Sequence, residues 1–544
     1  MKPKSYSYTF AASGIHDFLM AGGKIRDAVG ASELVEILAT GLLDAVREAL
    51  GLPDLIFSRR GGGAFTVVSE DRESLEKLRD LWSLTVRQVV PGLAFQQGLG
   101  EGENATQAIT QAMERAERDP NRFQPHVPQA GPLTERNPRT GWPATTLKKY
   151  VDAHEFLDPA TRAKRHKNFS QGQSLHDRVT PGSTGADAWI WPTMLYVEES
   201  QEADLRGKEV HSLPYKGENH YVAAIHADGN GMGSLLKRLK GNVDDVQTDG
   251  VELMRDFSEA VTKSVTFAAK KSIEVLTPES VDRVLPGRPV LLGGDDFSMI
   301  VRADLALDFT QAFLLAFQKQ SRDRLEPLAK KYRNAKLPTE MTASAGIAFF
   351  KARQPFHLAF TLAGSLCDHA KKQVRALPNL TIDAPVPSAI AFHRITSSVV
   401  YDYETIMESE MIVPGHPPLS LTMQPYGVGE KVEGLPNLSD LIDLMTFLNK
   451  KELRSGHARQ LLTLLRLNRT EAEKRYRRWR ENLDPNLNKK APKGGILKSL
   501  DQYLKNLGCQ EPDSFPERTG GRLSTTPLGD VMTLLAMGTG GNDD

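Results

Sequence analysis

The chain has little cysteine, no long hydrophobic run and no net charge. Its two cysteines, Cys367 and Cys509, are too few for a disulfide framework or a cysteine-rich zinc site. No run of about 18 apolar residues is present to form a membrane-spanning helix, and the N-terminus, Met1 to Lys4, contains no apolar signal region. The sequence therefore predicts a cytoplasmic protein that makes no contact with a membrane.

Opposite charges balance, because 68 lysines and arginines are matched by 68 aspartates and glutamates. Net charge therefore neither requires nor excludes a nucleic-acid partner. A hydrophobic content of 40% is ordinary for a soluble globular protein. The length of 544 residues suggests roughly three or four domains.

The most informative motif is Gly-Gly-Asp-Asp-Phe at residues 293–297. The apolar runs Val290 to Leu292 and Phe297 to Val301 predict a β-hairpin with Asp295 and Asp296 at its tip. Carboxylate oxygens suit Mg²⁺, which one or two carboxylates bind together with substrate phosphates. An acidic hairpin tip of this kind is typical of palm-type nucleotidyl transferases.

Asp228 supplies a second acidic strand end, after the predicted strand Tyr221 to Ile225. We expect Asp228 and Asp295 to hold a pair of Mg²⁺ or Mn²⁺ ions, with Asp296 as a further ligand or support. The Gly229 carbonyl is a candidate backbone ligand. The glycines that follow lack the G-x-G-x-x-G spacing of a dinucleotide fingerprint.

Apolar periodicity predicts an α+β fold with two palm-like halves. We assign residues 1–115 to a first palm without metal-binding acids and residues 220–434 to the catalytic palm, whose order β-α-β-β-α-β is ferredoxin-like. The elements predicted for the first are strand Ser5 to Ala11, helices Ile15 to Arg26 and Ala31 to Leu50, strands Leu55 to Ser58 and Phe65 to Ser69, and helix Arg72 to Val89. Those predicted for the second are strand Tyr221 to Ala227, helices Gly233 to Lys240 and Val251 to Val275, the acidic hairpin, helix Leu307 to Leu325, strand Met341 to Phe350, helix Phe356 to Ala376 and strand Ser388 to Ile395.

Two further regions complete the predicted organisation. Residues 116–219 are loop-rich and polar and indicate an inserted or linking region. Residues 435–544 indicate a helical C-terminal domain, with helices at Leu438 to Leu448, Leu453 to Leu467, Arg469 to Asn482 and Leu528 to Met537.

Together these motifs resemble the large polymerase-cyclase subunit of type III CRISPR effector complexes, of the Csm/Cmr kind. The resemblance covers residues 5–115 and 220–395. The C-terminal region resembles the family only in its helical character. The motifs that carry it are Gly14-Ile15-His16-Asp17-Phe18 with Lys24-Ile25-Arg26-Asp27, Gly61-Gly62-Gly63-Ala64-Phe65, Asp228-Gly229-Asn230-Gly231-Met232-Gly233, Leu291-Leu292-Gly293-Gly294-Asp295-Asp296, Ser344-Ala345-Gly346-Ile347 and Ala370-Lys371-Lys372.

The resemblance implies a nucleotidyltransferase that converts ATP to cyclic oligoadenylate and releases pyrophosphate when target RNA binds. It also implies partner subunits that carry a guide RNA. We expect Gly229, Gly293, Gly294 and Ser344 to bind nucleotide, and Lys371 or, alternatively, Lys372 to clamp its triphosphate. Adjacent helical residues point about 100° apart, so only one of the two lysines can face the site.

Two departures from that family carry expectations of absence. Fuller members begin with an HD nuclease domain, whereas here His16-Asp17 stands alone, and a nuclease metal site needs further His and Asp ligands. We expect a surface pair and no HD nuclease activity. Family members also commonly carry a cysteine zinc knuckle between the palms, and the comparable stretch Gly131 to Pro143 contains no cysteine. We therefore expect no structural zinc.

The segment Lys474 to Arg480 interleaves basic and aromatic residues. This pattern fits contact with an RNA backbone together with base stacking. In the alternative interpretation Tyr476 and Trp479 pack inward, three residues apart on one helix face, and the basic residues are solvated. The residues expected to contact RNA are Lys474, Arg475, Arg477 and Arg478.

Three other functions stay open on the sequence. The same site could adenylylate a small molecule. A diguanylate-type cyclase has a similar acidic hairpin, but that module is about one palm long. The chain could also be a non-catalytic scaffold of an RNA-guided complex, against which the intact Asp228, Asp295 and Asp296 argue. No motif encodes product ring size or the choice of adenine over guanine.

Overall fold

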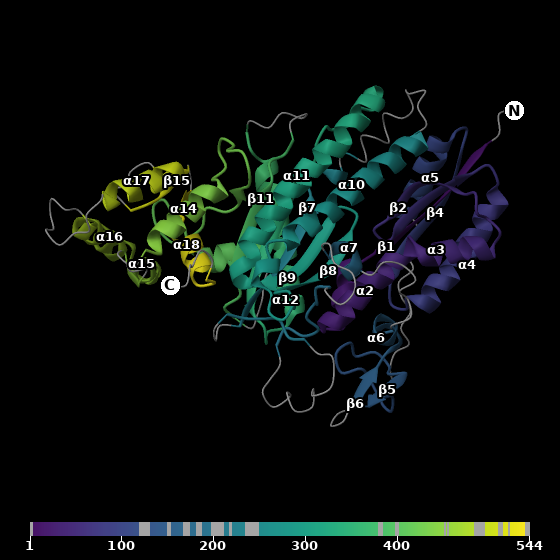
Figure 1. The fold of residues 1–544 in the computed structure, drawn as a ribbon, viewed down its shortest axis with the longest axis horizontal. Coiled ribbons are helices and arrows are strands. Elements are labelled where there is room, and N and C mark those ends of the chain that lie inside the picture. The colour runs from purple at the N-terminus through teal and green to yellow at the C-terminus, as the bar shows by residue number, and fades with distance from the viewer. Residues whose placement is uncertain are drawn as a thin grey trace.

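Two β-sheets and a group of C-terminal helices follow one another along the longest axis of the molecule (Figure 1). The structure is a computed structural model. It describes residues 4–118, 131–149, 154–166, 175–180, 188–196, 211–216, 220–233, 235, 250–378, 385–397, 402–450, 453, 456–483, 495–509, 515–520 and 523–538.

The first sheet has four antiparallel strands in the order β2-β3-β1-β4, which is the ferredoxin-like order. Its aromatic core stacks Phe10 on Phe65, with Trp82 meeting both rings edge-on. The elements are β1 (Ser5–Ser13), α1 (Ile15–Met20), α2 (Ile25–Leu38), α3 (Gly41–Ala49), β2 (Ile56–Gly61), β3 (Ala64–Ser69), α4 (Arg72–Val89), β4 (Ala94–Gly102) and α5 (Ala105–Arg118).

The strand β4 and the helix α5 are missing from our sequence analysis. Three alternate residues of β4 are glycines, which are poor strand formers, so the segment does not resemble a strand. The structure shows why glycine is needed there. A Cβ on Gly98 or Gly100 would lie 2.0 Å or 2.2 Å from backbone carbonyl oxygens of α5. The glycines therefore let α5 pack directly on the strand.

The central sheet contains a second ferredoxin-like unit, in which β10-β7-β9-β8 are antiparallel neighbours. Strand β11 extends it in parallel with β10, and β14 pairs with β11 at the edge. The α+β fold class is thus confirmed. The elements are β7 (Tyr221–Gly229), α10 (Gly250–Ile273), β8 (Gly287–Gly293), β9 (Asp296–Arg302), α11 (Ala306–Lys331), β10 (Ala343–Lys351), α12 (Phe356–Arg375), β11 (Ala389–Arg394) and β14 (Tyr426–Gly427). The predicted helix Gly233 to Lys240 lies almost wholly outside the described residues.

Helices cover both faces of the central sheet. The long helices α10 and α11 lie side by side over one face, where Phe297 of β9 stacks on Phe309 and Phe313 of α11 (Figure 1). Helix α12 lies directly against the other face. The packing is so close that a Cβ added to Gly346 of β10 would lie only 1.9 Å from the Ala363 carbonyl oxygen of α12. His226 of β7 pairs with Gly346 and therefore points to the same face, toward α12. Asp228 lies two residues further along β7 and points to that face as well, because side chains alternate along a strand.

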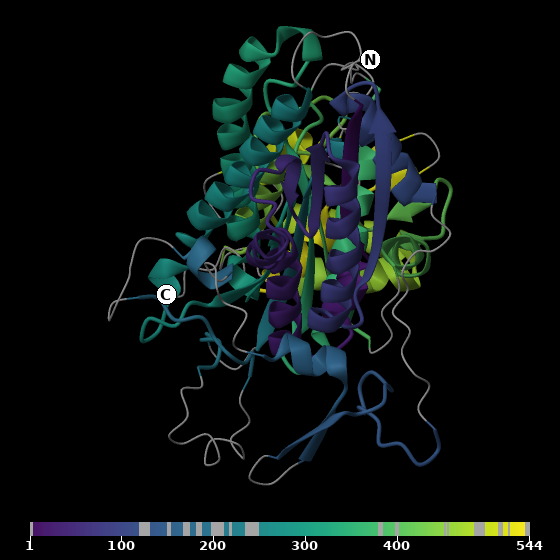
Figure 2. The ribbon, with the colours of Figure 1, turned by 90° about the vertical axis from the view of Figure 1, so that its right-hand side faces the viewer.

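The inserted region contains the hairpin β5 (Thr146–Lys149) and β6 (His154–Leu157), followed by α6 (Pro159–Lys164), which project below the first palm (Figure 2). The buried Asp158 carboxylate accepts hydrogen bonds from Asn137 Nδ2 at 2.6 Å, Thr140 Oγ1 at 2.9 Å and the Thr161 amide at 2.9 Å. These bonds tie the loop around Asn137 to the start of α6. The loop belongs to the stretch Gly131 to Pro143, in which we expect no structural zinc, and this absence stays a prediction.

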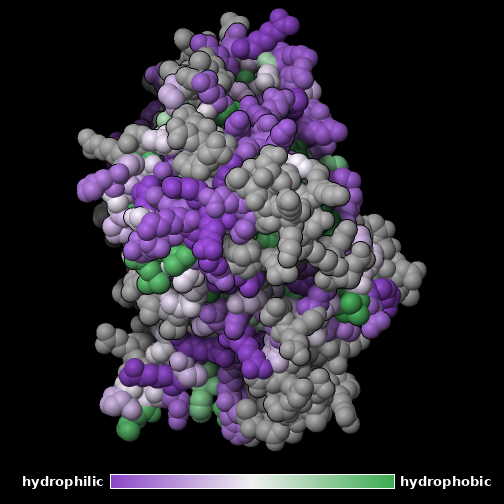
Figure 3. Space-filling view, turned by 90° about the vertical axis from the view of Figure 1, so that its left-hand side faces the viewer, coloured by the Kyte–Doolittle hydropathy of each residue, from purple (hydrophilic) through white to green (hydrophobic). Residues whose placement is uncertain are grey.

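The C-terminal region is less purely helical than predicted. Its helices are α14 (Leu438–Leu448), α15 (Gly456–Leu467), α16 (Arg469–Leu483), α17 (Ile496–Asn506) and α18 (Leu528–Leu535). It also holds β15 (Arg518–Gly520) and β16 (Leu523–Thr525), which join β12 (Ile412–Val413) and β13 (Leu419–Ser420) in a small sheet. Strands of two or three residues have too few side chains to show alternation, so periodicity could not reveal them. Figure 3 shows hydrophilic residues over much of this end of the molecule.

Among the residues that the structure describes, no helix is both long and apolar enough to cross a membrane.

We predict that Gly346→Ala destabilises the protein by about 3 kcal/mol, because the added methyl group would force α12 away from β10. The matched control is Gly364→Ala on α12, where a Cβ meets nothing within 4 Å. That change should stabilise the helix by about 0.5–1 kcal/mol. Urea unfolding of both variants measures the two effects, and equal stabilities would contradict the close packing of α12 on β10.

Candidate active site

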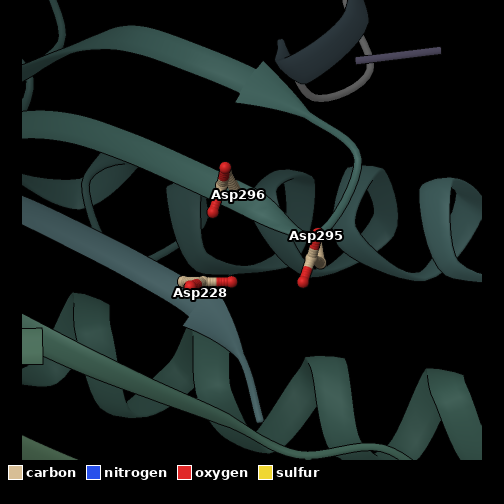
Figure 4. Close-up of side chains that lie close together, drawn as sticks. All are labelled: Asp228, Asp295 and Asp296. Atoms are coloured by element: carbon tan, nitrogen blue, oxygen red, sulfur yellow. The ribbon is translucent and has the colours of Figure 1, made fainter. Parts of the chain in front are cut away.

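Three carboxylates meet at one end of the central sheet (Figure 4). Asp228 is the penultimate residue of β7, Asp296 begins β9, and Asp295 lies in the turn between β8 and β9. One carboxylate oxygen from each lies within 4.8 Å of the others. The structure thus brings together the three acids that the sequence analysis selected. Their catalytic and metal-binding roles stay predictions.

The hairpin turn places Asp295 by its backbone geometry. Gly293 pairs with Asp296, so Gly294 and Asp295 form a two-residue turn. Gly294 has a φ of 64°, which suits the first central position of a type II′ turn and favours glycine. The neighbouring strand also needs glycine, because a Cβ on Gly229 would lie 2.9 Å from Asp295 Oδ2.

The electrostatics of the cluster is unfavourable for three free anions. Burial and the charge of Asp228 raise the pKa of Asp295 to about 7. Burial, Asp228 and Asp295 together raise the pKa of Asp296 well above its ordinary value. The arrangement therefore favours a positive charge at this place. Oxygen ligands from three carboxylates have the chemistry that Mg²⁺ or Mn²⁺ requires.

Lys371 is the lysine that faces the cluster. Its Nζ donates to Asp228 Oδ2, and its side chain is buried on the inner face of α12. Lys372 points away, because its side chain is 69% exposed and pairs with Glu404. The structure thus decides between the two candidates that the sequence left open.

Ser344 lies behind the acids. It is fully buried beside Asp228 on β10, and its hydroxyl donates to Asn230 Oδ1 at 2.9 Å. Asn230 Nδ2 in turn donates to Thr342 Oγ1 at 3.0 Å and to the Pro387 carbonyl. These bonds hold the chain just after Asp228. In this structure Ser344 supports the acidic strand end, and its contact with a nucleotide stays a prediction.

Residues 221–376 match the sequence model of one protein family, described as Cas10/Cmr2, second palm domain. Residues 221–376 are thus similar to a Cas10/Cmr2 second palm domain. The matched residues include Asp228, Asp295, Asp296 and Lys371, so the acidic cluster lies inside the matched segment. The resemblance stated from the sequence is confirmed for this segment.

Solved structures of the same kind are similar at low identity. Csm1 from T. onnurineus is 13% identical with a TM-score of 0.45, over 99% of this chain and 70% of that one. A Csm1–Csm4 cassette in complex with cA4 is 12% identical with a TM-score of 0.41, over 93% and 70%. In a Csm1–Csm4 cassette with pppApA the match covers 68% of this chain and 53% of that one, at 11% identity and a TM-score of 0.38. None of the curated protein sequences matches the chain.

A half-buried histidine adjoins the acids, and the sequence analysis missed it. His226 lies two residues before Asp228 on the same face of β7, and its Nδ1 is 2.9 Å from Ser298 Oγ on β9. Burial lowers the pKa of His226, the charge of Asp228 opposes this shift, and that of Lys371 adds to it. The period-two spacing of His226 and Asp228 was the available signal.

The first sheet and the acidic hairpin are in contact. His16 and Asp17, in the first turn of α1, are 48% and 95% exposed, as expected of a surface pair. The glycine turn of the first palm touches the acidic hairpin directly, because a Cβ on Gly62 would lie 3.4 Å from the Gly294 amide nitrogen. The tips of the two palm hairpins therefore meet.

The basic segment on α16 shows inward packing of its aromatic residues. Tyr476 and Trp479 are 1% and 7% exposed, so their rings are not available to stack on bases. Arg480 is buried and pairs with Asp501. The inward-packing interpretation is confirmed for the aromatic residues. Contact with RNA stays a prediction for the exposed basic residues of this segment, which are Lys474, Arg475, Arg477 and Arg478.

We predict that Asp295→Asn stabilises the metal-free protein at pH 8 on the order of 1 kcal/mol, because it relieves repulsion within the cluster. The pKa of Asp295 is raised on folding, so its protonation contributes stability that is complete below the unfolded pKa near 4. That contribution is lost as the pH rises through about 7. The gain should therefore shrink at pH 4.

Thermal unfolding with EDTA and with Mg²⁺ measures this effect. Mg²⁺ should stabilise the wild type more than Asp295→Asn. Asp17→Asn is the matched control, because its side chain is 95% exposed and outside the cluster. Equal stability of wild type and Asp295→Asn at both pH values would contradict the repulsion.

Proposed function

We propose that the chain is the nucleotidyltransferase subunit of an RNA-guided type III CRISPR antiviral complex. It converts ATP to a cyclic oligoadenylate second messenger and releases pyrophosphate when target RNA binds. The observation that carries this proposal is the cluster of Asp228, Asp295 and Asp296, with Lys371 beside it, on a Cas10/Cmr2 palm. Its partners are ATP, the other subunits of the complex, and the guide and target RNA.

The three carboxylates would hold two divalent cations. Once bound, the cations supply the positive charge that activates an ATP 3′-hydroxyl and stabilises charge on the α-phosphate and on departing pyrophosphate. Asp228, at the end of β7, and Asp295, in the turn between β8 and β9, would orient this charge. Asp296 adds a third oxygen ligand or holds the other two in place.

Lys371 has a second task in this proposal. In the structure its ammonium group bonds Asp228, and in the complex with ATP it would turn to the triphosphate. A lysine ammonium has three donors and rotates freely, so it can serve both partners. Gly293 and Gly294 present backbone without a Cβ, which lets a nucleotide approach the hairpin closely.

The first palm would present the second nucleotide. Joining two ATP molecules requires one on the cations and one delivering its hydroxyl in line with the α-phosphate. The turn at Gly61 to Gly63 touches the acidic hairpin and has no carboxylate that could bind metal. It therefore suits a neighbour that positions nucleotide without supplying metal.

Product analysis separates this function from the alternatives. The purified complex is incubated with each nucleoside triphosphate, with and without target RNA, and products are identified by mass spectrometry. Cyclic oligoadenylate supports the proposal. An adenylylated small molecule, a cyclic diguanylate or no product would instead indicate the adenylyl transferase, the diguanylate-type cyclase or the scaffold.

We predict that Asp295→Ala with Asp296→Ala abolishes oligoadenylate formation and leaves folding and assembly intact. Losing both carboxylates removes the cation ligands while relieving like-charge repulsion. Lys371→Ala should lower the rate on the order of 100-fold. Lys372→Ala is the matched control and should behave like wild type, because its side chain is exposed. Product formation by the double variant, measured by chromatography, would contradict the assignment.

We also predict that complementary target RNA raises the rate of pyrophosphate release by about 100-fold, equivalent to about 3 kcal/mol. A palm that polymerised ATP at all times would drain a common substrate, so an enzyme of this kind needs a poor resting geometry. The contact between the hairpin tips of the two palms is where small displacements would spoil in-line attack. Pyrophosphate release is compared between matched and mismatched RNA, and equal rates would show that this control is absent.

A further inference from the structure

A cleft of about 550 Å³ lies between the central sheet and the C-terminal helices, away from the acidic cluster. Its walls come from the end of β11, the turn around Glu410 and Met411, α15 and α18. Segments that are far apart in the sequence therefore build it together. A volume of this size is in the range of small-molecule sites and suits one ligand of nucleotide size.

Two arginines line this cleft without a protein counter-ion. Among the residues that the structure describes, neither the side chain of Arg394 on β11 nor that of Arg466 on α15 makes a hydrogen bond or an ion pair. Glu410 is the one acid of the lining, and it is not within 4.0 Å of either guanidinium group. The cleft therefore has two unpaired positive charges against one negative charge.

His393 lies in the same lining as the two arginines. Burial and the charges of Arg394 and Arg466 together lower the pKa of His393 to about 4. The imidazole is thus neutral at pH 7, and it can still exchange hydrogen bonds with a ligand. Arg394 on β11 and Arg466 on α15 border the cleft from two different elements.

The rest of the lining consists mainly of leucine and methionine side chains, together with three threonines and one glycine. Leu462 and Leu467 of α15 face Met532 of α18 around the cleft, and Leu467 is 78% exposed at its rim. An apolar wall beside two arginines matches a ligand with one flat or apolar part and one anionic part. A base or ribose can lie against the leucines while a phosphate accepts from guanidinium donors.

We propose that this cleft binds a phosphorylated nucleotide through Arg394 and Arg466. The nucleotide is either free or the phosphorylated end of an RNA strand, since both present the same chemistry. The cleft is too small for a nucleic-acid helix. This site shares no residue with the acidic cluster, so it stands independently of the proposed catalytic function.

Binding of AMP to the full-length chain tests the proposal. Isothermal titration is carried out in EDTA, because three carboxylates without cations repel phosphate. AMP should bind at one site, and inorganic phosphate should compete with it. Arg394→Ala and Arg466→Ala should each weaken AMP binding by about tenfold or more. Arg255→Ala is the matched control, because its side chain is 52% exposed on α10 and outside the cleft.

A second titration identifies the source of the nucleotide. A 5′-phosphorylated trinucleotide is compared with its 5′-hydroxyl form. If the wild type prefers the 5′-phosphorylated trinucleotide, binds AMP only weakly, and loses this preference in Arg466→Ala, the site is supported and its ligand is an RNA end. Absence of binding by AMP, phosphate and phosphorylated RNA overturns the proposal, and so does equal binding by wild type and Arg466→Ala. Arg466 is exposed on α15, so this variant removes no core contact and keeps the test valid if Arg394→Ala fails to fold.

Discussion

The repulsion among three half-buried carboxylates is the constraint on which the central part of this protein depends. Asp228, Asp295 and Asp296 stay within 4.8 Å because two pairs of strands hold them in register. One lysine, Lys371, offsets part of their charge, and it reaches Asp228 because Gly346 lets α12 lie directly on β10. The ion pair between Lys371 and Asp228 thus depends on how α12 packs on β10. The sheet holds the three carboxylates close together, and their mutual repulsion favours a positive charge among them.

Neutral residues form the hydrogen bonds that hold this end of the sheet in place. Asn230 bonds Ser344 and Thr342 and fixes the chain after Asp228 without adding a fourth charge. His226 lies beside Asp228 and bonds Ser298, and burial lowers its pKa, which favours the neutral ring. A further acid at either place would add to the repulsion. The polar surroundings therefore support the carboxylates without adding charge, and Lys371 is the basic side chain that pairs with Asp228.

The central sheet also connects two boundaries of different character. At the acidic end, glycine turns of the two palms touch through backbone atoms, so no long side chain separates them. On the side of β11, the sheet meets the C-terminal helices at a cleft lined by two arginines, three leucines and a single carboxylate, that of Glu410. The first boundary is rich in carboxylates, whereas arginines outnumber acids at the second. A ligand at either boundary would act on strands of the same sheet, since β10 pairs with both β7 and β11.

Local signals in the sequence were sufficient for the acidic hairpin, the order of the second palm and most long helices. Gly-Gly-Asp-Asp between two apolar runs and helical spacing in α12 and α14 are short-range patterns that need no knowledge of distant contacts. The tertiary structure alone decided which lysine faces the acids, because that depends on how α12 docks on β10. It also decided that Tyr476 and Trp479 pack inward, that the glycine-rich β4 is a strand, and that Arg394 and Arg466 line one cleft. Each of these depends on contacts between segments far apart in the chain, and periodicity within one segment carries no information about them.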